Sequence, residues 1–171
     1  YKSFSTELEA QRAYSGSPLP SSLGTRAKDG RSGADYPIFP SIAVDGASSG
    51  NPGMCEYRGV NADSHEVIFA SQQFFGTNNI AEFLAIVHAM ALCLQQGVRT
   101  PIYSDSRTAM AWVRTGKCKT TLKPSEKSAF ALDLIRRAEA WLAQNPPEVR
   151  VPLLKWKTEV WGEIPADYGR K

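Results

Sequence analysis

Hydrophobic positions along the chain follow two periods, one typical of strands and the other of helices. Short apolar runs with a strand-like composition occupy residues 41–46, 54–61 and 66–74, and Gly/Pro-rich or short polar connections separate them. These three runs predict an antiparallel meander. Further strands are expected at 102–104 and 149–156.

Apolar residues recur at three- and four-residue spacing in three other segments, which predicts amphipathic helices. The first covers 79–96 and ends at Gly97, the second follows a capping Ser106 as far as Val113, and the third covers 125–143. The order of these elements predicts an α/β fold, with a mixed five-stranded sheet and helices on both faces. The strand-helix-strand connections should be right-handed crossovers.

The pattern is different before residue 41. Residues 1–14 suggest a short helix that Ser5 or Thr6 can cap, and residues 15–40 are rich in Ser, Gly and Pro, which predicts a flexible linker. The folded domain is therefore expected at 41–171. Because the chain starts with Tyr rather than Met, we expect it to be part of a longer protein.

Composition narrows the class of protein. The chain has 171 residues, 42% of them hydrophobic, which is enough for one core. No apolar run approaches the roughly 20 residues of a membrane span, and the start lacks a signal-peptide pattern, so a soluble, cytoplasmic protein without a membrane partner is expected. Three widely spaced cysteines suggest reduced thiols rather than disulfides or a zinc site.

Charge is informative only in one stretch. The net charge of +3 says little about partners, but residues 107–127 carry six Lys or Arg side chains against one Glu. Such a stretch is usually a solvated surface, and it can also be a nucleic-acid footprint.

Four acidic residues are candidates for a metal site. Asp45 follows the apolar residues 42–44, Asp105 follows the strand expected at 102–104, Glu82 lies in the first turn of the long helix, and Asp167 lies near the end of the chain. Asp105 alone could simply cap the following helix. Together, the four carboxylates could hold two hard cations about 4 Å apart. Mg²⁺ fits this donor set, whereas zinc would call for His or Cys, and Mn²⁺ is a possible substitute.

Four motifs add a resemblance to this interpretation. They are DGASSGNPG (45–53), GTNNIAEFLAI (76–86), YSDSRTAMAWV (103–113) and WGEIPADYGRK (161–171). In this order they resemble bacterial ribonuclease H type 1, especially the group without the active-site histidine loop. The resemblance covers residues 41–171. It implies a sheet with strand order 3-2-1-4-5.

The resemblance also implies an activity and a partner. Members of this family hydrolyse the RNA strand of RNA/DNA hybrids by two-metal-ion catalysis and leave 5′-phosphate and 3′-hydroxyl ends. Asp45 would bridge both metals, Glu82 and Asp105 would complete one site, and Asp167 would help hold the other. Glu163 matches a mobile acidic residue near the metals, although it could also be a solvated loop residue. His65 and His88 receive no role.

Contacts to each nucleic-acid strand follow from the same resemblance. The expected RNA-strand contacts are Gly50, Asn51, Asn78, Asn79 and Arg107. The expected DNA-strand and phosphate contacts are Thr77, Asn79, Trp112, Thr120, Thr121 and Thr158. Arg107 departs from the Gln that close relatives carry. A helical Trp such as Trp112 is otherwise more often a core residue, and residues 76–79 could be only a turn and a helix cap.

Two further expectations concern the context of the domain. Residues 1–14 resemble the end of a small viroplasmin-like hybrid-binding module, which the linker would tether to a monomeric nuclease. The rival interpretations are another nuclease or strand transferase of the same fold, and a non-catalytic hybrid-binding protein. Four intact carboxylates argue against the latter, because pure binding gains nothing from a cluster of like charges.

Overall fold

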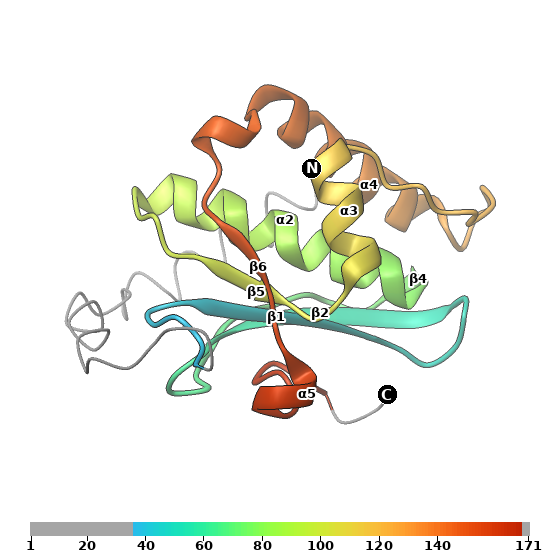
Figure 1. The fold of residues 1–171 in the computed structure, drawn as a ribbon. Helices are drawn as coiled ribbons and strands as arrows, with labels where there is room; N and C mark the ends of the chain where they lie inside the picture. Colours follow the sequence, from blue (N-terminus) through green and yellow to red (C-terminus); the bar gives the residue numbers. More distant parts are fainter. Residues whose placement is uncertain (1–35, 169–171) are drawn as a thin grey trace.

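The computed structural model describes residues 36–168, and the expectations for residues 1–14 and 15–35 lie outside this range. Within it, the chain forms one six-stranded mixed sheet with helices packed on it (Figure 1). The strands are β1 (Ile42–Ser48), β2 (Gly53–Asn61), β3 (Val67–Ala70), β4 (Phe74–Gly76), β5 (Ile102–Ser104) and β6 (Leu153–Lys155).

The strand order confirms the predicted topology with one correction. β1, β2 and β3 form the antiparallel meander, while β5 pairs parallel to β1 and β6 pairs parallel to β5, which gives the order β3-β2-β1-β5-β6. The prediction of a single strand over 66–74 was wrong, because β3 and β4 both pair with β2 as separate strands. Ser71 lies at the break, where its hydroxyl, instead of a backbone carbonyl, accepts the Tyr57 N–H at 2.9 Å.

The helices are close to their predicted positions. They are α2 (Asn78–Gln96), α3 (Arg107–Thr115), α4 (Ala129–Gln144) and the single-turn α5 (Thr158–Trp161), which was not predicted. The Ser106 hydroxyl accepts the Ala109 N–H at 3.1 Å and caps α3, as expected. Gly97 ends α2 with a φ of 71°, in the left-handed region that glycine occupies without strain.

Two predicted boundaries were too generous. α4 begins at Ala129 rather than at residue 125, because Ser125 and Ser128 form a hydrogen-bonded turn in which the Ser128 hydroxyl donates to the Lys123 carbonyl at 2.7 Å. The last strand is shorter than 149–156, because Pro147–Val149 form a 3₁₀ turn before it.

The sheet has a large core on one face and a small one on the other. α2, α3 and α4 cover one face, and α5 lies on the opposite face (Figure 1). Alternate residues of β1 point to opposite faces, so Val44 belongs to the large core under α2, whereas Ala43 belongs to a small cluster with Trp156 and Ile164. The small cluster holds the C-terminal segment against the sheet.

α2 is more apolar than the sequence analysis allowed. By length and hydropathy alone this 19-residue helix could cross a membrane, and 78% of its most apolar window is buried within the domain. Packing on the sheet therefore accounts for its apolar character.

Candidate metal centre

Three of the four predicted carboxylates come together at one point. Asp45, Glu82 and Asp105 each offer an oxygen, and these oxygens all lie within 4.8 Å of one another. Asp45 is fully buried and Glu82 is 2% exposed, whereas Asp105 is partly exposed. Carboxylates this close repel each other, so the arrangement favours a bound cation.

Parallel strand pairing places the two aspartates. β1 and β5 pair in register through Ile42 with Ile102 and Ala43 with Tyr103. Continued by two residues, this register places Asp45, in the middle of β1, beside Asp105, which directly follows the end of β5. Function commonly gathers at the carboxyl ends of parallel strands, as here at the end of β5.

Close packing of α2 on β1 places Glu82. A Cβ atom on Gly46 would lie 2.7 Å from the Ala81 Cβ, so only glycine leaves room for this approach. The Gly46 N–H donates to Glu82 Oε1 at 3.1 Å, and the Asn78 amide donates to Glu82 Oε2 at 3.5 Å. These two donors orient the carboxylate toward the aspartates.

The fourth predicted metal ligand, Asp167, and the additional predicted catalytic acid, Glu163, lie in the C-terminal segment after α5. Asp167 is partly exposed and is not a member of the group of three. Its N–H donates to the Ile164 carbonyl at 2.9 Å. Glu163 is exposed and follows Gly162, whose φ is 81°. The metal and catalytic roles of both residues stay predictions.

Arg58 was missed by sequence reasoning. It lies on β2 directly opposite Asp45, and its guanidinium donates to the carbonyls of Ala166 and Asp167. Counting the register of the predicted meander back from its turn could have placed a cation beside Asp45, but a lone Arg in a strand carries no motif.

The predicted RNA-strand contacts lie on neighbouring loops. Gly50 and Asn51 occupy the turn between β1 and β2, while Asn78 and Asn79 begin α2. The pairing of β2 with β4 brings these two regions together, because it joins residue 53 to residue 76. Asn51 and Asn79 are exposed. Their contact with RNA stays a prediction.

The other predicted RNA contact and a predicted DNA contact lie on α3. Arg107 is the first residue of this helix and is exposed. Trp112 is partly buried, packs against the large core and meets the Phe83 ring edge to face at 6.2 Å. Trp112 therefore packs on the core, as a helical Trp usually does, and its contact with DNA stays a prediction.

The predicted phosphate contacts are divided among three places. Thr77 caps α2 by accepting the Ile80 N–H at 3.3 Å. Thr120 and Thr121 lie between α3 and α4, in a segment anchored by the Cys118 N–H, which donates to Glu139 Oε2 at 2.9 Å. Thr158 begins α5 on the opposite face of the sheet from α3 (Figure 1).

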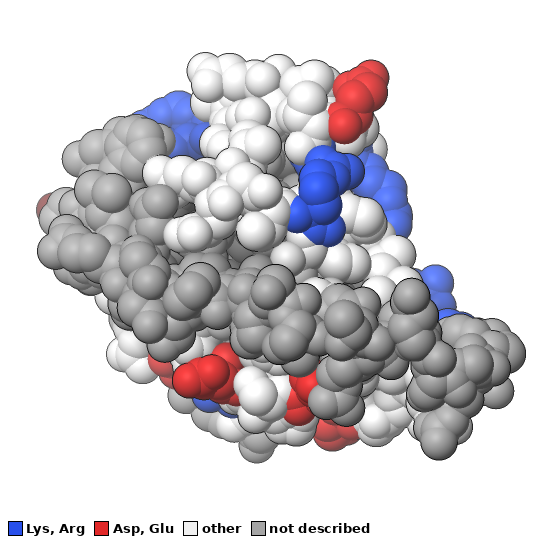
Figure 2. Space-filling model, turned by 90° about the vertical axis from the view of Figure 1, so that its left-hand side faces the viewer, with Lys and Arg blue, Asp and Glu red and all other residues white. Residues whose placement is uncertain are grey.

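The basic stretch is a surface feature. Its six Lys and Arg side chains, Arg107, Arg114, Lys117, Lys119, Lys123 and Lys127, are all exposed. Figure 2 shows a face on which most visible Asp and Glu side chains lie toward the lower edge and most visible Lys and Arg side chains lie above them. Although the net charge of the chain is small, its acidic and basic side chains are therefore distributed unevenly on this face.

None of the described histidine and cysteine side chains is a member of the acidic group. Burial lowers the pKa of His88 to about 3, so the ring is neutral near pH 7. Burial also raises the pKa of Cys93 to about 12, and burial together with Glu139 does the same for Cys118. These thiols are protonated and unreactive, in line with the sequence prediction.

The donor set fits a hard divalent cation. All three converging ligands are carboxylates, which suit Mg²⁺ or Mn²⁺ better than a softer metal. Fold and site together define an α/β protein with three clustered carboxylates, suited to a hard cation, beside the end of β5.

Comparison with known proteins gives the family. The RNase H family model matches residues 40–150, and the chain belongs to this family. Over 80 residues the chain is 32% identical to a ribonuclease H of Neorickettsia sennetsu, an alignment that covers 43% of this chain and 53% of that relative. The chain therefore spans about half the length of this curated relative.

Two solved structures are distantly similar in fold. The N-terminal RNase H domain of a Mycobacterium tuberculosis protein has 23% identity and a TM-score of 0.41, over 68% of this chain and 86% of that chain. RNase H1 of the archaeon Halobacterium salinarum has 21% identity and a TM-score of 0.38, over 68% and 82%.

The family match has a specific extent. Residues 40–150 contain the three clustered carboxylates, Asp45, Glu82 and Asp105. Glu163 and Asp167 lie beyond it. The acidic group is therefore the best supported part of the site.

Proposed function

We propose that this protein is an endonuclease that hydrolyses the RNA strand of RNA/DNA hybrids. The observation that carries the proposal is the group of three carboxylates within 4.8 Å, located in the segment that matches the RNase H family. Such a group serves phosphate-ester hydrolysis, because hard cations held by carboxylates also bind phosphate oxygens.

The metal ligands in this proposal are Asp45, Glu82 and Asp105, with Asp167 completing a second position. Two bound Mg²⁺ ions, or Mn²⁺ in their place, would supply an activated water and a counter-charge for the leaving 3′ oxygen, so that cleavage leaves a 5′-phosphate. The protein contributes orientation. Gly46 and Asn78 hold the Glu82 carboxylate, so that it need not reorganise when a cation binds.

Substrate choice is assigned to the surfaces around this site. The wide minor groove of a hybrid displays the 2′-hydroxyls that mark the RNA strand. The adjoining turn at Gly50 and Asn51 and the exposed start of α2 offer backbone and amide groups for that side. The exposed segment with Thr120 and Thr121 lies in the basic stretch, where it is suited to a DNA phosphate.

A cleavage assay tests the proposal. The full chain is incubated with Mg²⁺ and, in separate reactions, with three substrates of matched sequence. In the first a labelled RNA strand is paired with DNA, in the second the same strand is paired with RNA, and the third is a DNA duplex. We expect cutting of the RNA within the hybrid, 5′-phosphate products and intact DNA. Equal cutting of duplex DNA would favour another nuclease of the same fold. Binding of the hybrid without any cutting would favour a non-catalytic role.

A further inference from the structure

Arg58 lies on the same face of the sheet as Asp45. The two residues are direct partners in the antiparallel pair of β1 and β2, so their side chains project from the same face. Two residues along, Ala43 and Val60 form another direct pair on this face, and both belong to the small cluster with Ile164 and Ala166. Arg58 therefore projects toward the C-terminal segment.

The guanidinium of Arg58 forms hydrogen bonds with two adjacent backbone carbonyls of that segment. Its Nε donates to the Ala166 carbonyl at 3.0 Å and its Nη2 donates to the Asp167 carbonyl at 2.9 Å. The ring of Tyr168 lies 4.5 Å from the guanidinium carbon. A planar fork that engages two successive carbonyls fixes both the position and the direction of the backbone.

The segment is tethered at its other end as well. Trp156 Nε1 donates to the Gly162 carbonyl at 2.9 Å, and Ile164 and Ala166 are buried in the small cluster. With the backbone fixed on both sides, the Asp167 carboxylate moves mainly by rotation about its own side-chain bonds. Arg58 is the member of this arrangement that starts from the strand position opposite Asp45.

We propose that Arg58 is a positioning residue that sets Asp167 relative to the group of Asp45, Glu82 and Asp105. The inference rests on the proposed function, because it assigns Asp167 to the same site. Arg58 acts through the backbone of Asp167 and does not itself take part in the chemistry. Removing the two guanidinium donors of Arg58 loosens the C-terminal segment around Asp167 and weakens the contribution of the Asp167 carboxylate to cation binding.

The test uses the full chain with Arg58→Met, which keeps the length of the side chain but removes both donors. Without added metal, hydrogen exchange of the amides of residues 162–168 should become faster in the variant. In the cleavage assay, the Mg²⁺ concentration for half-maximal rate should rise about 10-fold, the usual scale for losing a group that orients a metal ligand. Because both residues act through one carboxylate, Arg58→Met should add little to Asp167→Asn.

Two further variants keep the test decisive. Arg99→Met is the matched control, because Arg99 donates to the Val149 carbonyl elsewhere in the fold, and it should leave both readouts unchanged. Arg58→Lys keeps the positive charge but cannot donate to both carbonyls at once. It should therefore change amide exchange and the Mg²⁺ dependence less than Arg58→Met does, and it serves as the test variant if Arg58→Met does not fold. The proposal would be overturned if Arg58→Met left amide exchange and the Mg²⁺ dependence unchanged. It would also be overturned if Arg58→Met reduced Mg²⁺ affinity as much in the Asp167→Asn background as it does alone. If the unmodified protein cuts no hybrid, the proposed function fails, and exchange still shows whether Arg58 holds the segment.

Discussion

At the scale of single residues, the charge of the acidic group decides its chemistry. Asp105→Asn keeps the shape of the side chain and removes one negative charge from the three clustered carboxylates. We expect hybrid cleavage to fall at least 100-fold, the upper range for a perturbed metal site, while hybrid affinity changes little. Rates and affinities are measured on the same labelled hybrid, with binding measured in EDTA.

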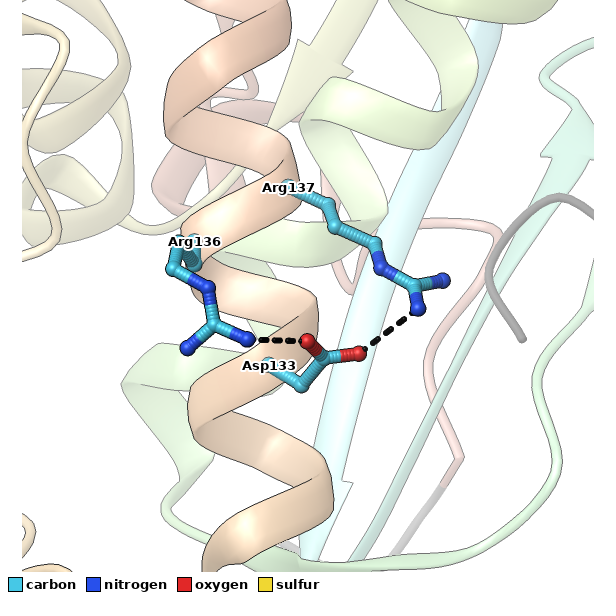
Figure 3. Close-up of polar contacts among 3 residues, drawn as sticks. All are labelled: Asp133, Arg136 and Arg137. Atoms are coloured by element: carbon cyan, nitrogen blue, oxygen red, sulfur yellow. Dashed lines mark hydrogen bonds and ion pairs between the residues drawn. The ribbon is translucent and has the colours of Figure 1, made fainter. Parts of the chain in front are cut away.

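A carboxylate outside the site provides the control for this variant. Asp133 on α4 pairs with both Arg136 and Arg137 (Figure 3). Ion pairs at a surface contribute about 1 kcal/mol or less, so Asp133→Asn should cut the hybrid at the normal rate. Loss of hybrid binding in Asp105→Asn would instead mean that Asp105 serves the structure of the site.

His88 links stability to pH. Its Nδ1 lies 2.8 Å from the Tyr57 hydroxyl, its ring stacks on Phe69 at 4.2 Å, and its pKa falls from 6.5 to about 3 on burial. Between these two values the unfolded chain binds a proton that the folded protein does not. The free energy of unfolding should therefore decrease as the pH falls from 6.5 toward 3, by about 1.4 kcal/mol per pH unit from this residue.

The measurement is urea unfolding across that pH range. The double variant His88→Leu with Tyr57→Phe removes both polar partners together, so neither is left buried alone. Its unfolding free energy should depend less steeply on pH, whereas Tyr57→Phe alone should keep the dependence. Identical slopes in the double variant and the unmodified protein would show that His88 does not carry this effect.

At the scale of elements, Arg150 joins the ends of two helices. Its guanidinium donates to the Leu142 carbonyl at 2.9 Å and the Asn145 carbonyl at 2.6 Å in and after α4, and to the Val113 carbonyl at 3.3 Å in α3. All three carbonyls lie in or just after the last turn of a helix, where backbone carbonyls lack partners within the helix, and that of Val113 also accepts the Gly116 N–H at 3.2 Å. The contacts fix α3 and α4 against each other and so define the span of the segment between them.

We expect Arg150→Met to lower the free energy of unfolding by about 3 kcal/mol, because several charge-assisted hydrogen bonds to carbonyls are lost together. Arg99→Met, which removes one exposed contact, should cost about 0.5 kcal/mol or less. Urea titrations of both variants provide the comparison. Equal losses would show that the three carbonyls are satisfied equally well by water.

The elements also show where sequence patterns were sufficient. Apolar spacing and the caps Ser106 and Gly97 placed α2 and α3 closely, because these signals are local. The break at Ser71 was missed, because it depends on a hydroxyl that meets Tyr57 across the sheet. α5 was missed because a single turn has no apolar period to detect.

At the scale of the whole molecule, a cation at the acidic group should stabilise the fold. The carboxylates of Asp45, Glu82 and Asp105 come from three separate elements, so a cation that binds them favours the folded chain. Each tenfold increase of Mg²⁺ or Mn²⁺ above its dissociation constant should raise the free energy of unfolding by about 1.4 kcal/mol. Thermal unfolding at matched ionic strength measures this gain.

Asp105→Asn should lose most of the gain, and Asp133→Asn should keep it, because only Asp105 belongs to the acidic group. Equal stabilisation of both variants would indicate a general effect of salt rather than a bound cation.

The sequence by itself determined the fold class, because apolar periods are local, and it named the candidate acids, while the strand order was implied by the family resemblance. Three of these acids converge because β1 and β5 pair in parallel and α2 packs closely on β1. The tertiary structure decided how these acids are held. The close approach at Gly46, which brings Glu82 to its donor, and the grip of Arg58 on Asp167 both join residues far apart in the sequence. Such contacts depend on strand register and helix packing, which local sequence patterns do not predict.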